Sequence, residues 1–199
     1  VYFKLGNLTN SDTDANAEFV VIEFDALVDN TSSGSNDSGD NRHNDFRVQS
    51  GNTTQFDLPN GDRPQARIVE PSLTQPTITS DVPNVDAGDT VEYTVNFAVN
   101  SGINQSDAFD VVLTTALPDN FTYGSIGTIL IDGVAVNSGD AGYPTISQSG
   151  SSLSVSFDRL NEGQTVQIKY DGTVDGTITP DDTLTTDATL TWTSLETDT

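Results

Sequence analysis

The clearest pattern in this sequence is an alternation of apolar and polar residues over positions 91–99. The apolar positions are Val91, Tyr93, Val95, Phe97 and Val99, and polar side chains at 92, 94 and 96 separate them. A period of two is typical of a β-strand with one face in a core and the other in water. Turn-forming residues at 86–89 and 100–102 predict a turn at each end of this strand.

The same alternation recurs along the rest of the chain, and no segment shows a helical period. It predicts further strands at 77–80, 107–117, 121–123, 128–131, 134–136, 153–157, 166–174 and 184–192. Within 107–117, the side chains of Phe109, Val111 and Leu113 are expected to point inward. Many short strands with turns between them indicate an all-β fold of the β-sandwich type.

The first 70 residues carry fewer strands than the rest of the chain. Alternation predicts them at 1–5, 19–28, 46–48 and 65–70. One face of the longest strand consists of Val20, Ile22, Phe24, Ala26 and Val28. Residues 29–41 are rich in Ser, Asn, Asp and Gly, and no regular structure is expected there.

A boundary between two modules is predicted at residues 71–76. This segment contains Pro71 and Pro76, and two prolines so close together favour an extended, stiff linker. It separates residues 1–70 from residues 77–199.

An internal repeat relates the two parts. Residues 1–5 parallel 155–159, residues 19–29 parallel 165–175, and residues 45–48 parallel 187–190. Residues 1–70 are therefore interpreted as the C-terminal strands of an incomplete module, and residues 77–199 as a complete one. A repeated supersecondary unit indicates a linear array of modules.

The incomplete module lacks strands to close it. A sandwich of this type needs about seven strands, and residues 1–70 offer four. We expect strands outside this chain to complete it. They come either from the same polypeptide or from a neighbouring subunit by strand addition.

The order of several motifs resembles the DUF11-type repeat. They are Val-Glu-Pro-Ser-Leu-Thr at 69–74, Asp-Ala-Gly-Asp-Thr-Val-Glu-Tyr-Thr-Val at 86–95, Ser-Asp-Ala-Phe-Asp-Val-Val-Leu at 106–113, Leu-Pro at 117–118 and Asn-Glu-Gly-Gln-Thr-Val at 161–166. The resemblance implies immunoglobulin-like β-sandwich modules in tandem, as strung along bacterial and archaeal surface proteins, adhesins and extracellular filaments. It implies no common catalytic residue. Many such repeats have Asn-Thr-Ala where this chain has Thr186-Asp187-Ala188.

Charge and composition narrow the range of partners. The chain has 30 acidic and 7 basic residues and a formal net charge of −23, so a nucleic acid would be repelled. Such an acidic chain suits solubility, life in salt or the binding of divalent cations. There is no Cys for a disulfide. No apolar run reaches transmembrane length, so no membrane insertion is expected in this segment.

Catalysis is not predicted. His43 is the only histidine, and it lies among polar residues, where a solvated side chain is expected. No Ser lies in a Gly-x-Ser-x-Gly elbow. Acidic residues are so numerous that nothing singles out a pair for glycoside hydrolysis. The chain is therefore predicted not to be an enzyme and to require no cofactor.

A calcium site is the first specific binding hypothesis. Asp12, Asp14, Asn16 and Glu18 place an oxygen ligand at every second position of a loop, as hard cations require. The loop departs from an EF-hand because Ala17 stands where the conserved Gly would be. The alternative is a solvated acidic turn.

Glycosylation is the second hypothesis. The Asn-x-Ser/Thr acceptor pattern occurs at Asn7, Asn30, Asn36, Asn52, Asn104 and Asn120, all in predicted turns or loops. Attached glycans would suit an extracellular glycoprotein without disulfides.

These observations favour a non-catalytic structural repeat of an extracellular filament, fibril or cell-surface stalk. Its partner would be another copy of itself, head to tail in a linear array, outside the cell or at its surface. The alternative is an adhesin module that binds a glycan or another surface through its loops. Tyr123 and Tyr143 are the only aromatic residues near loops that could serve this alternative.

Overall fold

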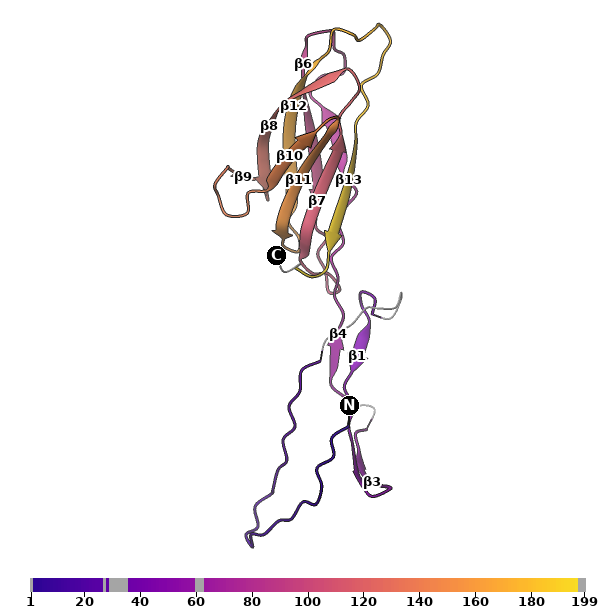
Figure 1. Ribbon diagram of the computed structural model, residues 1–199, viewed down its shortest axis with the longest axis vertical. Helices are drawn as coiled ribbons and strands as arrows, with labels where there is room; N and C mark the ends of the chain where they lie inside the picture. Colours follow the sequence, from indigo (N-terminus) through magenta and orange to yellow (C-terminus); the bar gives the residue numbers. More distant parts are fainter. Residues whose placement is uncertain (1, 27, 29–35, 60–62, 197–199) are drawn as a thin grey trace.

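The structure, a computed structural model, describes residues 2–26, 28, 36–59 and 63–196. The described residues form strands and loops but no helix. A long sandwich occupies one end of the molecule, and an open arrangement of short strands and loops occupies the other (Figure 1). The predicted all-β, immunoglobulin-like fold is confirmed.

The sandwich consists of two antiparallel sheets. The first has the order β5 (Thr77–Ser80), β6 (Thr90–Ala98), β12 (Thr165–Val174), β8 (Phe121–Ile131) and β9 (Val134–Val136). The second has the order β10 (Thr145–Ser149), β11 (Ser152–Leu160), β7 (Ala108–Ala116) and β13 (Asp187–Thr193). The chain passes from one sheet to the other after β6, β7, β9, β11 and β12. This crossing distributes early and late strands over both layers.

The core lies between the two sheets, where the alternating apolar positions meet. All five apolar residues predicted to face inward over 91–99 are buried. Ile168 of β12 pairs with Val95 on one side and with Ile129 on the other, and all three are at most 1% exposed. From the opposite sheet, Leu113 and Phe157 enter the same cluster. Burial of one such side chain is worth about 1.5–3 kcal/mol, so this cluster holds the sandwich together.

Phe109 departs from the predicted inward face of β7. Asp110 has a φ of 48°, and the pairing of β7 with β13 shifts register beside it. This irregularity interrupts the period of two, so that Ala108 and Val111 are buried while Phe109 is not. The guanidinium of Arg159 instead lies over the ring of Phe109, 5.6 Å from its centroid.

Two strand predictions in the sandwich need correction. The segments predicted separately at 121–123 and 128–131 belong to one strand, β8, which continues through two glycines, Gly124 and Gly127. A Cβ atom at Gly124 would lie 2.3 Å from a carboxylate oxygen of Asp171, and one at Gly127 would lie 3.3 Å from Cβ of Lys169. The two glycines therefore let β8 lie close to β12. Strand β10 was not predicted, because its short sequence alternates only weakly.

Gly172 of β12 is required for close packing between β12 and β8. A Cβ atom at this position would lie 2.3 Å from Cζ of Phe121 and 2.5 Å from the carbonyl oxygen of Thr122. Neither atom can move away freely, since Phe121 is buried and the oxygen belongs to the backbone.

We predict that Gly172→Ala destabilises the sandwich by about 1–3 kcal/mol, because the added methyl group overpacks the core. Chemical denaturation followed by circular dichroism measures the change. Gly176→Ala is the matched control, since a Cβ atom there meets nothing within 4 Å. Equal stability of the two variants would contradict the assignment.

The described part of the first 70 residues contains two separate two-stranded sheets. One pairs β1 (Asn41–His43) with β4 (Gln65–Arg67), and the other pairs β2 (Arg47–Ser50) with β3 (Thr53–Asp57). Strands β2 and β4 overlap the predicted segments 46–48 and 65–70. Strand β3 was not predicted, and β1 begins at the end of a segment for which no regular structure was expected.

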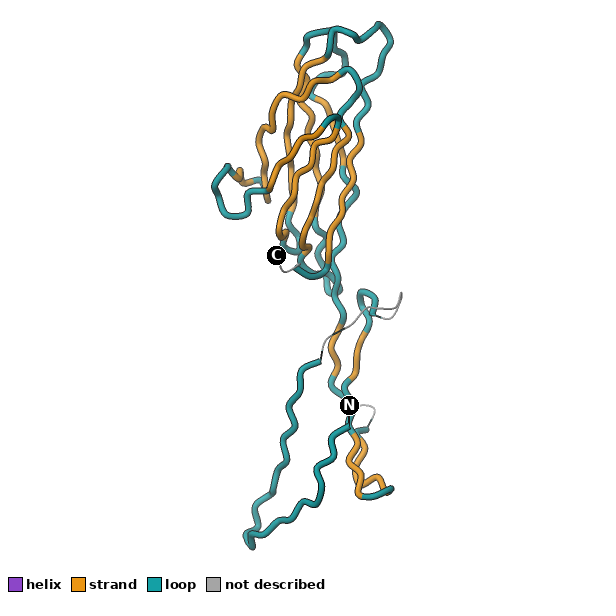
Figure 2. The backbone as a smooth tube through the Cα atoms, in the orientation of Figure 1, coloured by secondary structure: helices purple, strands orange, loops and turns teal. Residues whose placement is uncertain are grey.

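The predicted strands at 1–5 and 19–28 are not paired in the structure. Their described residues, 2–5, 19–26 and 28, form no β-ladder and are exposed. Figure 2 shows residues 2–26 as an open loop without strands. The alternation is present in the sequence, but the part of the chain that the structure describes contains no neighbouring strand to hydrogen-bond with it.

Candidate functional site

Large apolar side chains lie uncovered throughout the first 70 residues. They are Tyr2, Phe3, Leu5, Leu8, Phe19, Val20, Val21, Ile22, Phe24, Val28, Phe46, Val48, Phe56 and Val69, each at least 43% exposed. Ile68 is the only buried residue among the described part of residues 2–70. Exposed apolar side chains in such numbers are typical of a surface that takes part in an interaction.

Some of these side chains already contact one another. The ring centroids of Phe3 and Phe24 are 6.0 Å apart, so the segments predicted at 1–5 and 19–28 approach each other. The rings of Phe46 and Phe56 are stacked at 5.5 Å across β2 and β3. The contacts form small clusters, but none of these four rings is buried.

Residues 70–74 do not form a free linker. The carbonyl of Ser72 accepts a hydrogen bond from the backbone N–H of Asn100 at 2.8 Å, and the N–H of Thr74 donates to the carbonyl of Ala98 at 2.9 Å. The indole N–H of Trp192 donates to the carbonyl of Pro71 at 3.3 Å. This segment is therefore attached along the end of β6.

Asn104 lies at the centre of the contact between the two parts. Its side-chain oxygen accepts a hydrogen bond from Arg67 at 2.8 Å. Its carbonyl accepts bonds from the hydroxyl of Ser38 at 2.7 Å and from the N–H of Glu70 at 3.2 Å. We call residues 67–74 together with residues 98–105 the junction. Its hydrogen bonds connect the sheet of β1 and β4 to the end of the sandwich.

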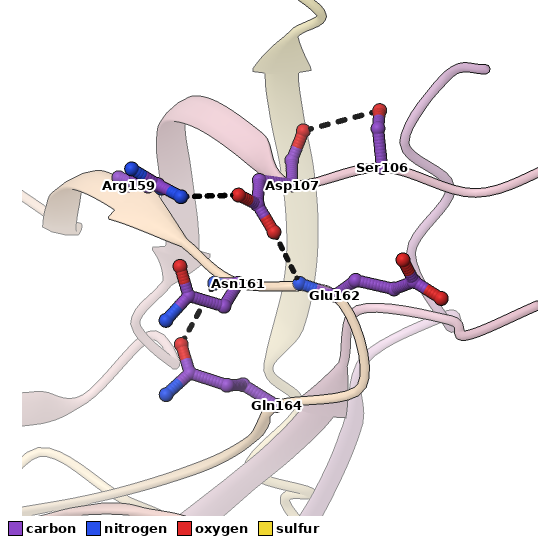
Figure 3. A network of polar contacts seen from close by, with 6 residues as sticks. All are labelled: Ser106, Asp107, Arg159, Asn161, Glu162 and Gln164. Carbon is purple, nitrogen blue, oxygen red and sulfur yellow. Dashed lines mark hydrogen bonds and ion pairs between the residues drawn. The ribbon is translucent and has the colours of Figure 1, made fainter.

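A network of polar contacts braces the loops beside the junction (Figure 3). The carboxylate of Asp107 accepts hydrogen bonds from the backbone N–H of Glu162, at 2.8 Å, and from the guanidinium of Arg159. The N–H of Asn161 donates to the side-chain oxygen of Gln164 at 2.8 Å. The backbone bond from Glu162 lowers the pKa of Asp107 below its ordinary value, partial desolvation opposes this, and Arg159 lowers it further.

We predict that Asp107→Asn lowers the stability of the sandwich at neutral pH by about 1 kcal/mol, since a hydrogen-bonded charge is lost. A carboxyl group whose pKa is lower in the folded state stabilises that state above its unfolded pKa, about 3.9, and the contribution is lost as the pH falls through the folded pKa. The difference between wild type and variant should therefore disappear in strong acid.

Thermal melts of both proteins across this pH range measure the difference. Asp119→Asn, in an exposed turn, is the control and should match wild type. A wild-type-to-variant difference at Asp107 that persists unchanged in strong acid would contradict the role of its charge.

The three acidic residues of the loop predicted to bind calcium lie close together, and Asn16 is hydrogen-bonded to one of them. Oxygen atoms of Asp12, Asp14 and Glu18 lie within 4.8 Å of one another, and all three residues are exposed. Asn16 uses its backbone N–H and its side-chain amide to donate to Asp14, at 2.8 and 3.0 Å. An acidic turn of this geometry suits either hydration or a weakly held hard cation, and calcium binding stays a prediction.

If the loop binds calcium, isothermal titration calorimetry of the full chain should resolve one site with a Kd of about 10⁻⁴–10⁻³ M, in the range of extracellular modules. Asp14→Asn should remove that site, because it deletes a charged ligand. Asp25→Asn, which removes an exposed charge from the same part of the chain, is the control and should retain it. Identical titrations for wild type and Asp14→Asn would reject the site.

The predicted glycosylation sites lie in different surroundings. Asn7 and Asn52 are exposed, Asn36 and Asn120 are half-buried, and Asn30 lies outside the described residues. Asn104 belongs to the junction, where its side-chain nitrogen would be 2.8 Å from a Cβ atom at Gly39. A glycan on that nitrogen requires the junction to open, whereas the exposed positions are free of this restriction.

His43 and two hollows on the sandwich were compared with the arrangements that catalysis requires. His43 lies exposed in β1 and pairs in register with Gln65. A hollow of about 500 Å³ beside Asn96 and Gln167 has no ionisable side chain in its lining. A second hollow, of about 330 Å³, has Arg159 as its only ionisable lining residue. Neither arrangement pairs a nucleophile with a base.

The two tyrosines considered for glycan binding are not free aromatic platforms. Tyr123 and Tyr143 are both half-buried and pack against the hydrophobic core. Burial is the main cause that raises the pKa of Tyr123, and Asp171 adds to it.

Comparison with known proteins finds similarity in fold only. No family model matches the sequence, and no curated protein matches it. The N-terminal domain of a Streptococcus gordonii adhesin is 16% identical with a TM-score of 0.50, over 61% of this chain and 30% of that one. The pilus backbone protein RrgB of Streptococcus pneumoniae is 18% identical with a TM-score of 0.46, over 60% of this chain and 53% of that one.

BcpA, the major pilin subunit of Bacillus cereus, is 10% identical with a TM-score of 0.48, over 77% of this chain and 51% of that one. The chain thus spans about a third to a half of the length of these proteins. The similarity to the adhesin domain agrees with the sandwich fold. The resemblance to the DUF11-type repeat stays a prediction.

Proposed function

We propose that this chain is a non-catalytic structural repeat of an extracellular filament or cell-surface stalk, assembled as a linear array of immunoglobulin-like modules. One observation carries the proposal. A closed sandwich is joined through a hydrogen-bonded junction to strand-forming residues whose apolar side chains are uncovered.

The energetics favour assembly. Each large apolar side chain left in water forgoes about 1.5–3 kcal/mol, and a small domain has only about 5–15 kcal/mol of net stability. Unpaired strands are also templates for further strands, since their N–H and C=O groups lack partners. Covering these residues with another module buries their apolar side chains and pairs their backbone groups. A contact between two different surfaces produces a thread wherever the rotation between successive modules does not close a ring.

The junction suits a load-bearing thread. Bonds from Ser38, Arg67 and Glu70 meet at Asn104, and Ser72 is bonded both to Asn100 and to Gln105. A connector held at this many points restricts bending between successive modules. Stiffness and reach, rather than chemistry at a pocket, are the work that this arrangement supports.

The surroundings proposed for the chain are outside the cell or at its surface. The net charge of −23 keeps neighbouring threads apart at low ionic strength, and salt or divalent cations weaken that repulsion. No helix among the described residues has the length and hydropathy to cross a membrane. Glycans at the exposed acceptor residues Asn7 and Asn52 would be compatible with such an array.

Electron microscopy of native material tests the proposal. We expect threads with a regular axial repeat, and discrete particles without a repeat would overturn it. In the native host, Ile22→Asp should prevent incorporation into threads, because it places a charge on the uncovered apolar face. Asn44→Asp, at an exposed polar position of the same part, should be incorporated as wild type.

A further inference from the structure

Residues 20–28 reproduce the core-facing residues of β12. The repeat aligns Val20 with Val166, Ile22 with Ile168, Phe24 with Tyr170, and Val28 with Val174. The four residues of β12 are at most 2% exposed, whereas Val20, Ile22, Phe24 and Val28 are 43–58% exposed. The same apolar pattern is thus buried in one module and uncovered in the other.

The position of β12 in the sandwich shows which neighbouring strands residues 19–28 lack. In the sandwich β12 is central, paired with β6 along one edge and with β8 along the other. Residues 1–5 correspond to β11, which pairs with β10 and β7. Phe3 and Phe24, which contact each other, correspond to Phe157 and Tyr170 of one buried cluster. The missing partner is therefore the early half of a sandwich, equivalent to β5–β10, and not a single added strand.

Ala26 is the first residue that distinguishes residues 19–28 from β12. It corresponds to Gly172, where a Cβ atom would lie 2.3 Å from the ring of Phe121 and 2.5 Å from the backbone oxygen of Thr122. The Cβ atom of Ala26 would therefore collide with a second copy of this β8. A fitting partner has a smaller residue at the position of Phe121 and a backbone that runs wider beside it.

Glu23 is the second difference between residues 19–28 and β12, because its charge is opposite to that of the corresponding residue. It corresponds to Lys169, whose Nζ lies 2.5 Å from Oε1 of Glu92 on β6. In the same position, Glu23 would face Glu92 as a like charge, which costs stability on a neighbouring strand. A fitting partner has a basic residue at the position of Glu92.

We propose that residues 1–5 and 19–28 are completed by the early half of a different immunoglobulin-like module. That module has a small residue in place of Phe121 and a basic residue in place of Glu92. A second copy of residues 77–160 is not the occupant. The inference rests on the proposed array, and it makes the order of modules specific, since discrimination arises from contacts that disfavour the wrong partner. It also protects the closed sandwich from exchange of β12 for residues 19–28 of another copy.

The first test transfers these residues into β12 of the full chain. Lys169→Glu together with Gly172→Ala should lower the Tm of the sandwich by about 5 °C or more. Glu92→Lys should restore the part lost through Lys169→Glu. The loss through Gly172→Ala should be smaller in a Phe121→Ala background than in wild type. Each rescue assigns the loss to the named partner instead of to general unfolding.

Tyr170→Phe is the matched control, because it places in β12 the phenylalanine found at the corresponding position 24. It should change the Tm less than Lys169→Glu or Gly172→Ala. It removes only the hydroxyl contact with Thr186. The inference is overturned if the Lys169→Glu and Gly172→Ala variant melts at the wild-type temperature, because residues 19–28 would then fit this chain's own early half. It is also overturned if Lys169→Glu is not rescued by Glu92→Lys.

The second test asks whether the wild-type chain completes itself. Sedimentation at increasing concentration, with hydrogen exchange of residues 19–28, should show no association that protects them. Protected dimers would identify a second copy as the occupant and overturn the inference. Threads in native material would still support the proposed array in that case, so the two ideas fail separately.

Discussion

A long strand with an apolar face is stabilised when neighbouring strands pair with it and a second sheet covers that face. β12 meets these conditions, because β6 and β8 flank it and Val166, Ile168 and Tyr170 are buried. Residues 19–28 carry the same pattern and lack all three neighbours among the described residues. This difference separates the two modules. Residues 77–199 form a closed sandwich, whereas residues 1–70 present the surface through which we propose that the chain joins an array.

The junction links these two modules into one mechanical element. Residues 70–74 extend the edge of β6, and Asn104 of the sandwich accepts hydrogen bonds from Ser38, Arg67 and Glu70. In the proposed array, these hydrogen bonds add to the covalent connection in holding the first module against the sandwich. Glu162 strengthens the same end, because its N–H donates to Asp107 and its carboxylate accepts from the N–H of Gly102.

Local patterns predicted the sandwich well, and long-range contacts account for what they missed. The inward face of 91–99 follows directly from the period of two. Phe109 was misplaced because Asp110 interrupts that period, and a positive φ at an aspartate leaves little trace in sequence. The segments at 1–5 and 19–28 have strand patterns but no partners, which alternation alone does not reveal. The role of Asn104 in the junction depends on residues far away in the sequence. Its Asn-x-Ser pattern predicted glycosylation instead.

Hydrogen exchange of residues 19–28, compared between the isolated chain and native assembled material, tests the central claim most directly. We expect rapid exchange in the isolated chain, where the described amides of this segment have no strand partners, and protection close to that of β12 after assembly. Protection of residues 19–28 in the isolated monomer would contradict the account, since the module would then be complete. Rapid exchange in native assembled material would contradict it equally.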